Sequence, residues 1–422
     1  MRERSRPPRF PEAFPGVHYY DDAEADAVLR VIRARAPFRY YGVDFQGEAR
    51  SLEKAFAADL GVRFAQATGS GSSALAAAAA AFGIGPGQEV LVPGFFWVAT
   101  VAAVVRAGGV PVLVEIDDSF TMDPADLADK ITDYSRLIIP VHMCGVPSDM
   151  PAIMEIAADR GIAVLEDCAQ ADGATLHGKP VGTFGDMGMF SFQINKNITA
   201  GEGGMLVTDD ATLYARANAG HDLGIRWSAA MSMESSDRAG WEASEHVLWG
   251  VGSRMSELTA AVVRAQLPKL PAIVAAMRAS KHRVQAALGD LPKLRWCRVD
   301  DPDGDSGPFI LLVLDDPAAA VRFATYCSKE GLAATRLADY GLHVYANVQA
   351  LVEKRSNSPD GYPWTHPANV PLVREYAHGA LSKTDGLLAH SVMLCVPSRM
   401  TVEQEDDYIA VCRDAHAAAY AV

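Results

Sequence analysis

The sequence predicts an α/β protein in which a large domain with a mostly parallel β-sheet is followed by a smaller α+β domain. Between residues 60 and 210, short apolar runs rich in Val, Ile and Leu alternate with alanine-rich helical stretches. Turn-forming Gly, Pro and Asp residues stand between the runs. Past residue 260 this alternation stops, and longer helical stretches separate isolated strand-like runs. Alternating strands and helices are typical of parallel sheets covered by helices.

The elements of the large domain can be placed in order. Its strands are almost wholly apolar, which is typical of strands buried on both faces of a parallel sheet. Ligands of such sheets bind at the carboxyl ends of the strands, so we expect the chemistry there. The predicted strands are Glu89–Val92, Val110–Ile116, Leu137–Val141 and Ile162–Glu166, and the predicted helices are Ser73–Phe82, Trp97–Ala107, Pro124–Ile131 and Met150–Arg160.

The small domain follows from helix and strand signals after residue 256. A proline in the first turn, or an Asp or Thr cap before it, marks where a helix begins. The predicted helices are Glu257–Leu267, Pro271–Leu288, one from Pro317 (capped by Asp316) to Gly331, and one opened by the capping box Thr401 and Gln404; the predicted strands are Phe309–Leu314 and Val392–Val396. Residues 228–249 and 355–367 lack periodicity and are predicted as loops.

The length of the chain is sufficient for both domains. Its 422 residues are 49% apolar and 21% charged, which is the composition of an ordinary globular protein and disfavours disorder, fibres and membrane bundles. We expect the large domain to cover residues 13–262 and the small domain residues 263–422.

Charge and cysteine content limit the partners and the compartment. The chain has 38 basic and 52 acidic residues, a net charge of −14, which disfavours nucleic acids and anionic membranes as main partners. Its six cysteines form no CxxC pair, so neither a zinc site nor a disulfide framework is expected. Four arginines near the N-terminus are followed by no apolar stretch, which fails the test for a secretory signal. We therefore expect a cytoplasmic protein without a metal site.

A glycine- and serine-rich segment, 69–74 (GSGSSA), matches the G-x-G-x-x-A fingerprint of dinucleotide-binding folds, and Glu89 lies twenty residues after Gly69. In those folds the acidic residue ends its strand, whereas Glu89 opens one. The preceding run Phe64–Thr68 (FAQAT) is also a poor buried strand. What remains is a loop that enters a helix N-terminus, where N–H groups and hydroxyls can hold a phosphate. For this motif alone, a serine-rich helix cap without a ligand would be the better interpretation.

A lysine lies in an apolar segment just before a glycine-rich turn. Lys196 follows Phe192 and Ile194 and precedes Gly201–Gly204. Most lysines are solvated surface charges, but a desolvated lysine has a lowered pKa and becomes a usable nucleophile. Lys196 is therefore a candidate for forming a Schiff base.

Polar and aromatic residues follow the ends of two predicted strands. Asp167 is either a cap for the next turn or a counter-ion to a protonated heterocycle, because a buried carboxylate is costly without a positive partner. Gln170 lies one turn on as a hydrogen-bond donor, and Trp97 is either core or a flat surface for an aromatic ring. Together with the phosphate loop and Lys196, these features match the needs of pyridoxal phosphate, and no other common cofactor uses all four.

Six segments together resemble the DegT/DnrJ/EryC1/StrS family, which are fold-type I pyridoxal-phosphate aminotransferases acting on keto sugars and cyclitols. Their order and spacing match over most of the chain. The segments are GSSAL (71–75), VPGFFWVAT (92–100), PVHMCG (140–145), EDCAQADG (166–173), SFQINKNITAGEGG (191–204) and RMSELTAAVVRAQL (254–267).

The resemblance implies roles for the candidate residues. It implies that Lys196 bonds covalently to the cofactor, that Asp167 pairs with the pyridine nitrogen, that Gln170 lies near the ring and its 3-hydroxyl, that Trp97 stacks on the ring, and that Ser72, Ser73 and Ser191 hold the phosphate. It further implies a homodimer with shared active sites. The implied reaction moves an amino group from glutamate or glutamine to a keto or aldehyde group of a sugar, sugar nucleotide or cyclitol, with Lys196 as base and acid.

Two positions depart from the family pattern. The family usually has an asparagine two residues before the arginine of RMSE, supplied by the neighbouring subunit to the phosphate, and this chain has Gly252 there. Phe96 replaces the usual Thr before the stacking aromatic, which predicts a more apolar pocket wall. His142 and Arg254 are candidate substrate contacts, although a histidine bonded to backbone and an arginine in an intersubunit ion pair are equally good interpretations. Residues 300–309, with PVHMCG, most resemble the branch of 8-amino-8-deoxy-octulosonate transaminases.

Three other functions stay open at this point. Relatives that dehydrate sugars carry histidine in place of the lysine, so Lys196 disfavours a dehydratase, but an aromatizing enzyme of aminoshikimate type would keep every cofactor residue. A non-catalytic regulator would carry a fused DNA-binding module, for which the residues before the α/β region leave no room. A nicotinamide dehydrogenase, suggested by the glycine fingerprint, predicts no visible absorption and no trapping of Lys196 by borohydride.

Overall fold

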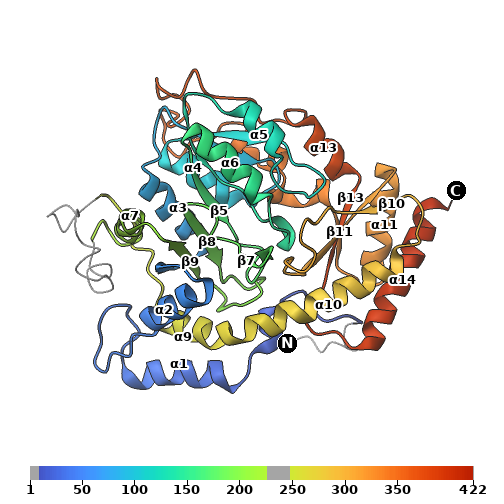
Figure 1. Ribbon diagram of the computed structural model, residues 1–422, viewed down its shortest axis with the longest axis horizontal. Coiled ribbons are helices and arrows are strands. Elements are labelled where there is room, and N and C mark those ends of the chain that lie inside the picture. The colour runs from blue at the N-terminus through green and yellow to red at the C-terminus, as the bar shows by residue number, and fades with distance from the viewer. Residues whose placement is uncertain (1–8, 226–247, 422) are drawn as a thin grey trace.

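The fold is built around a seven-stranded, mostly parallel β-sheet, which confirms the predicted fold class. A computed structural model describes residues 9–225 and 248–421 (Figure 1). The strand order is β1-β9-β8-β5-β4-β2-β3; β9 is antiparallel to both neighbours, and the other neighbouring pairs are parallel. The strands are β1 (Phe64–Thr68), β2 (Glu89–Pro93), β3 (Val110–Val114), β4 (Ser135–Ile138), β5 (Ala163–Asp167), β8 (Met187–Ser191) and β9 (Gly204–Thr208).

Helices bury both faces of this sheet. In β2, Val90 and Val92 pack with α3 and α4, whereas Leu91 packs with α5 and α6. Every residue of β2 is buried, as its continuous apolar pattern predicts. The helices around the sheet are α1 (Asp22–Ala34), α2 (Glu48–Leu60), α3 (Gly71–Phe82), α4 (Val98–Ala107), α5 (Pro124–Lys130), α6 (Met150–Arg160), α7 (Ala211–His221) and α9 (Glu257–Gln266), with short elements η1 (Gly16–Tyr19), η2 (Met143–Gly145), β6 (Thr175–Leu176) and β7 (Lys179–Pro180).

A four-stranded antiparallel sheet forms the core of the C-terminal part, in the order β10-β11-β13-β12. Helices α11 and α14 pack together beside it, and α10 packs on α14 (Figure 1). The elements are η3 (Leu267–Lys269), α10 (Leu270–Leu288), β10 (Leu294–Trp296), β11 (Phe309–Leu314), α11 (Pro317–Lys329), β12 (Ala334–Arg336), β13 (Ser391–Cys395) and α14 (Val402–Tyr420). The expected boundary between residues 262 and 263 falls inside α9, and the division into two domains stays a prediction.

An irregular segment between β12 and β13 returns to the large sheet. The Phe96 N–H donates to the His343 carbonyl (2.9 Å), and the Tyr376 hydroxyl donates to the Pro111 carbonyl (2.8 Å). The segment therefore packs on the loop that follows β2 and on β3 itself. Its elements are η4 (Leu337–Asp339), η5 (Gly341–His343), η6 (Tyr345–Asn347), α12 (Gln349–Val352) and α13 (Ser382–Ala389). Residues 355–367 form no helix or strand, as expected, whereas most of the predicted loop 228–249 lies outside the described residues.

One strand prediction was wrong. The run Phe64–Thr68 forms β1, and all five residues are buried. The polar Gln66, which made the run a poor strand, is satisfied in the interior: its amide donates to the Ala67 carbonyl (2.9 Å), and the Asn218 side chain donates to its oxygen. A buried polar side chain is tolerated when its hydrogen bonds are made.

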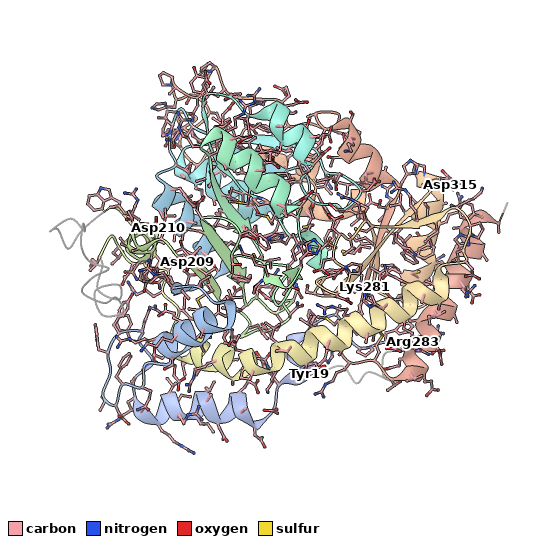
Figure 2. All side chains as sticks on the ribbon, viewed as in Figure 1. Tyr19, Asp209, Asp210, Lys281, Arg283 and Asp315 are labelled. Atoms are coloured by element: carbon pink, nitrogen blue, oxygen red, sulfur yellow. The ribbon has the colours of Figure 1, made fainter. Side chains whose placement is uncertain are left out.

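The stretch Glu257–Leu288 is long and apolar enough to cross a membrane by length and composition alone. In the structure it is two helices joined by η3: α9 lies against α1 and α2, and α10 lies against α14. Polar side chains of α10 also pair with residues later in the chain: Lys281 pairs with buried Asp305, and Arg283 pairs with Glu405 (the two basic residues are labelled in Figure 2). This packing is that of a core helix in a globular protein.

Candidate active site

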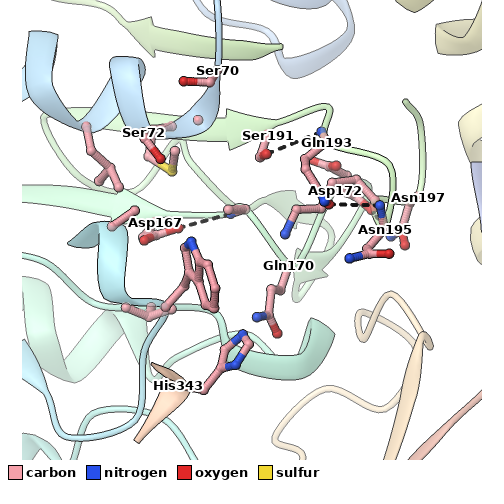
Figure 3. Close-up of a pocket in the computed structure, with 18 of the residues that line it drawn as sticks. Ser70, Ser72, Asp167, Gln170, Asp172, Ser191, Gln193, Asn195, Asn197 and His343 are labelled. Carbon is pink, nitrogen blue, oxygen red and sulfur yellow. Dashed lines mark hydrogen bonds between the residues drawn. The ribbon is translucent and has the colours of Figure 1, made fainter. Parts of the chain in front are cut away.

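A cavity of about 410 Å³ lies at the carboxyl ends of the parallel strands (Figure 3). Strand β5 ends there at Asp167, β8 ends there at Ser191, and α3 begins there at Gly71. Tyr340 and His343, from the irregular segment after β12, line it as well. The cavity is therefore placed where open parallel sheets bind their ligands.

Asp167 is a buried carboxylate on the cavity wall. It is 3% exposed; the Thr100 hydroxyl donates to Oδ2 (2.8 Å) and the Ala169 N–H donates to Oδ1 (3.1 Å). No ion pair within the described residues includes it. Burial raises the pKa of Asp167, against these hydrogen bonds and the charge of Lys196. A protonated ring nitrogen in the cavity would supply the missing positive charge.

Lys196 stands on a turn between β8 and β9 and lines the cavity. Its N–H donates to the Gln193 carbonyl (2.9 Å), and its own carbonyl accepts the Gly16 N–H (3.2 Å), so its backbone is held from two sides. Burial lowers the pKa of the Lys196 amine, and the charges of Asp172 and Asp167 oppose that shift. A desolvated amine with a lowered pKa is a better nucleophile and base at neutral pH.

The N-terminus of α3 presents hydroxyls and N–H groups to the cavity. Ser70 caps the helix, and Ser70, Ser72 and Ser191 line the cavity wall. Gly71 allows this approach, because a Cβ there would lie 2.9 Å from the Cβ of Ser191. Ser73, which the sequence predicts for phosphate binding, does not line the cavity; its Oγ lies 2.6 Å from the Oγ of Ser70. Ser70 takes its place in a cradle that suits a phosphate.

Four aromatic rings line the cavity: Trp97, Phe309, Tyr340 and His343. Trp97 is 43% exposed, and its ring centroid lies 4.7 Å from that of His343, which in turn stacks on Tyr340 at 3.8 Å. The His343 Nδ1 lies 3.2 Å from the Tyr340 carbonyl. An N–H at Nδ1 satisfies that carbonyl, which leaves Nε2 as an acceptor. Burial lowers the pKa of His343 to about 4, so its ring is neutral at pH 7.

Gln170 presents a donor to the cavity. Its Oε1 accepts the Cys144 N–H (3.1 Å), and its side chain lines the cavity (Figure 3). The amide NH2 is therefore the end left to donate to a ligand, which is the role that the sequence predicts for it.

Asp172 is a second buried carboxylate on the cavity wall. It is 3% exposed, and neither of its carboxylate oxygens has a hydrogen-bond partner among the described residues. Its main-chain carbonyl accepts a hydrogen bond from the Asn197 side chain (2.7 Å). Burial raises the pKa of Asp172 well above its ordinary value, and the charge of Lys196 opposes that shift.

His142 does not reach the cavity. The Ser148 N–H donates to its Nδ1 (2.9 Å), so Nε2 carries the proton and donates to Glu166 Oε2 (3.0 Å). Glu166 also accepts three backbone N–H groups of residues 182–185. His142, Glu166 and Cys168 are close enough to hold a metal ion, but the nitrogens of His142 and the oxygens of Glu166 are already engaged. The geometry thus favours a structural histidine over a substrate contact.

Arg254 and Phe96 also lie away from the cavity wall. Arg254 forms an ion pair with Asp222 of the same chain, and its guanidinium lies 5.5 Å from the centroid of the Phe38 ring. A Cβ at Gly252 would lie 3.3 Å from that guanidinium, so Arg254 fills the space beside the glycine. Phe96 is fully buried in the core, so it does not make the cavity wall more apolar as the sequence suggested.

Sequence reasoning missed Ser70, Asp172, Tyr340 and His343. Ser70 carried a signal, because a serine before a helix is a typical cap. Asp172 carried one too, because a carboxylate in an otherwise apolar run needs a partner. Tyr340 and His343 carried none, since their segment has no periodicity and only the tertiary fold brings it to the cavity.

The chain matches the model of the DegT/DnrJ/EryC1/StrS aminotransferase family over residues 44–356. It is 42% identical over 227 residues to UDP-N-acetyl-3-dehydro-alpha-D-glucosamine 3-aminotransferase of Acidithiobacillus ferrooxidans, covering 53% of this chain and 58% of that protein. It is 37% identical over 260 residues to 3-amino-5-hydroxybenzoate synthase of Amycolatopsis mediterranei, covering 61% and 63%. The matched regions thus span less than two thirds of these relatives.

A solved structure extends the likeness to nearly the whole chain. The crystal structure of a 3-amino-5-hydroxybenzoic acid synthase superposes with a TM-score of 0.77 at 27% identity. The superposition covers 98% of this chain and 100% of that one. The small C-terminal part therefore shares the fold of this relative as well.

Proposed function

The chain belongs to the DegT/DnrJ/EryC1/StrS aminotransferase family, and from this premise we propose that it is a pyridoxal-phosphate-dependent aminotransferase. It would move an amino group from an amino acid to a keto or aldehyde group of a sugar, sugar nucleotide or cyclitol. One observation carries the proposal: a half-buried lysine, an unpaired buried carboxylate and a helix N-terminus line the same cavity. The names of the curated relatives support the reaction class.

The residues present fit this cofactor. The cradle at Gly71 has no room for a Cβ and offers hydroxyls and N–H groups to the phosphate. Asp167 would accept the ring N–H, and Trp97 presents an exposed face for stacking. The Gln170 amide would donate near the ring hydroxyl. Pyridoxal phosphate, when bound, supplies an aldehyde that reacts with amines and a ring that accepts an electron pair.

Lys196 performs the proton transfers in this proposal. Burial lowers the pKa of its amine, so a larger share is unprotonated near neutral pH. The amine can then take a proton from the α-carbon of the donor and later return that proton to a different carbon of the reacting group. Asp167 would hold a ring nitrogen in its protonated form, because this carboxylate lines the cavity and no ion pair among the described residues includes it.

Beside its carboxylates and Lys196, the cavity wall carries uncharged polar side chains. His343 offers Nε2 as an acceptor, and Gln193 and Asn195 line the same cavity. We propose that these side chains contact hydroxyl groups of the acceptor, whereas His142 and Arg254 do not. Glutamate or glutamine is the proposed donor.

An aromatizing enzyme is the second candidate. The relative from Amycolatopsis mediterranei is named 3-amino-5-hydroxybenzoate synthase, and a solved synthase of that name covers nearly the whole chain. Such an enzyme would use the same lysine and carboxylate, so the cofactor residues do not separate the two reactions. The product does, because only the second reaction yields an aromatic ring.

We propose a homodimer that acts in the cytoplasm. Exposed apolar side chains cluster near the contact of Arg254 with Phe38: Tyr41 is 62% exposed and its ring lies 4.8 Å from that of Phe38, and Val251 is 70% exposed. A second copy would bury this face. Light scattering should then give twice the 45.1 kDa of one chain. All six cysteines are free thiols, as expected in a reducing compartment.

The reaction is tested by donor and acceptor panels. The protein, loaded with pyridoxal phosphate, is incubated with glutamate, glutamine or aspartate and a set of keto sugar nucleotides and keto cyclitols, and products are read by mass spectrometry. Equal amounts of an amino sugar or amino cyclitol and a 2-oxo acid support the proposal. An aromatic amine would select the second candidate, and no amino transfer from any donor would contradict both.

A further inference from the structure

We propose that Asp172 is a positioning residue for Lys196, and that its charge decides when the lysine amine in the cavity carries a proton. The inference rests on the proposed function, which gives Lys196 its role as nucleophile and base. It goes beyond that function because Asp172 touches neither the phosphate cradle nor the partners of Asp167.

The backbone holds Asp172 and Lys196 near each other. Asn197, the neighbour of Lys196, donates its side-chain amide to the Asp172 carbonyl (2.7 Å; dashed in Figure 3). On the other side, Gly173 has a φ of +78°, and a Cβ there would lie 2.9 Å from the Val274 side chain. The turn that carries Asp172 therefore has little freedom to move away from the lysine segment.

The burial of Asp172 requires a compensating charge. Its side chain is 3% exposed, both oxygens lack a hydrogen-bond partner, and it faces the cavity. A carboxylate in such a place is costly unless a cation lies near. On the part of the cavity wall that the structure describes, Lys196 is the sole lysine or arginine. The two groups are not in direct contact, but each shifts the pKa of the other toward the charged form.

Most other titratable groups that face Lys196 are neutral. Burial raises the pKa of Tyr340 and of Cys144, and it lowers the pKa of His343 to about 4. These three groups are therefore uncharged at neutral pH. The other titratable groups that share the cavity with the lysine are carboxylates.

Three carboxylates share the cavity with Lys196, and Asp172 is the one whose oxygens have no hydrogen-bond partner among the described residues. Asp167 already accepts hydrogen bonds from a hydroxyl and an N–H group, and Glu202 is exposed, so water screens its charge. The charge of Asp172 opposes the loss of the proton from Lys196 more than that of Asp167 does. Removal of this charge should let the amine lose its proton at a lower pH.

The test measures the amine directly, on the full chain freed of cofactor. Lys196 is labelled in competition with trace acetic anhydride between pH 6 and 10, and its peptide is quantified by mass spectrometry. Only the unprotonated amine reacts, so the labelling rate follows its titration. We expect Asp172→Asn to label Lys196 about tenfold faster than the wild type at pH values below both midpoints, which corresponds to a midpoint about one pH unit lower.

Matched variants show whether the change in the labelling midpoint comes from the charge of Asp172. Asp172→Glu keeps the charge and should label within about twofold of the wild type, and Glu202→Gln removes an exposed carboxylate from the same cavity and should do likewise. If Asp172→Asn does not fold, as judged by circular dichroism, Asp172→Ser serves the same test. Equal midpoints for the wild type and the neutral variant would overturn the proposal, as would an equal shift in Glu202→Gln.

The outcome separates this inference from the proposed function. Labelling requires neither cofactor nor substrate, so a shifted midpoint in a protein that transfers no amino group would uphold the role of Asp172 and remove the function. An active aminotransferase in which Asp172→Asn leaves the labelling midpoint of Lys196 unchanged would uphold the function and remove the role of Asp172.

Discussion

Glu166 and Asp167 are neighbours at the end of β5, but their side chains meet opposite conditions. Glu166 is fully buried, and its two oxygens accept hydrogen bonds from His142 and from three backbone N–H groups. Asp167 points into the cavity, accepts two hydrogen bonds and has no cation. Successive residues of a strand face opposite sides, so one residue serves the structure and the next serves a ligand. Burial alone therefore does not identify a functional carboxylate; unmet hydrogen-bonding capacity beside a cavity does.

The largest expected effect is on the rate of amino transfer, and it comes from a residue that lines the cavity. Lys196→Ala removes the amine that takes and returns the proton, and amino transfer should fall by about 10³-fold or more. The rate of 2-oxo acid formation measures it, and an unchanged thermal unfolding midpoint shows that the fold is intact. Turnover at the wild-type rate would remove Lys196 from the mechanism.

The two neighbouring carboxylates should respond in opposite ways to isosteric amides. Glu166→Gln leaves buried N–H donors facing an amide and should lower the free energy of unfolding by about 3 kcal/mol. Asp167→Asn should leave the unfolding free energy within about 1 kcal/mol of the wild type, because the raised pKa of Asp167 means that its charge destabilises the folded chain above that pKa. Amino transfer should nevertheless fall about 10- to 100-fold, since a charge-assisted hydrogen bond to the ring is lost.

Urea unfolding and steady-state rates separate the two carboxylates. Equal destabilisation by both substitutions would mean that Asp167 is structural as well, and the comparison would fail.

Acid should destabilise the fold through a third buried group, His221. It is fully buried, and burial lowers its pKa to about 3, below the ordinary value of 6.5. Below pH 6.5 the unfolded chain therefore binds a proton at His221, and the folded chain does not. The contribution of His221 to the free energy of unfolding is fully present above pH 6.5. It decreases by about 1.4 kcal/mol per pH unit as the pH falls toward 3. In urea unfolding between pH 6.5 and 5, His221→Gln should show a slope shallower by that amount; parallel slopes would contradict it.

The smallest expected effect concerns the phosphate cradle. Gly71→Ala places a Cβ 2.9 Å from the Cβ of Ser191 and should weaken cofactor binding about tenfold, a loss of ~1.4 kcal/mol. Gly386→Ala is the control, because a Cβ there meets nothing within 4 Å. Equilibrium titration with pyridoxal phosphate, followed by absorbance, gives both affinities. Equal affinities for the two variants would show that the cradle does not hold the phosphate.

The sequence predicted the parts of the fold that local patterns specify. The apolar runs of β2 to β5 and the caps of α11 and α14 carry their own signals. β1 was misread because the Gln66 oxygen accepts its hydrogen bond from Asn218, which lies far along the chain. Asp167 and Lys196, which carry local sequence signals, both line the cavity. His343 carried no such signal, because tertiary packing alone brings it there.

The sequence could not decide between two plausible kinds of partner for one residue. His142 and Arg254 follow motifs that suit either a substrate or a structural partner. Only the structure shows that His142 is hydrogen-bonded to Glu166 and that Arg254 forms an ion pair with Asp222.

Borohydride reduction of the purified protein, followed by peptide mass spectrometry, tests the central claim most directly. We expect loss of visible absorption and a pyridoxyl-phosphate mass added to the peptide that contains Lys196, and no such addition after incubation with a saturating amino donor. Addition at another lysine, or no addition to a protein saturated with pyridoxal phosphate, would contradict it.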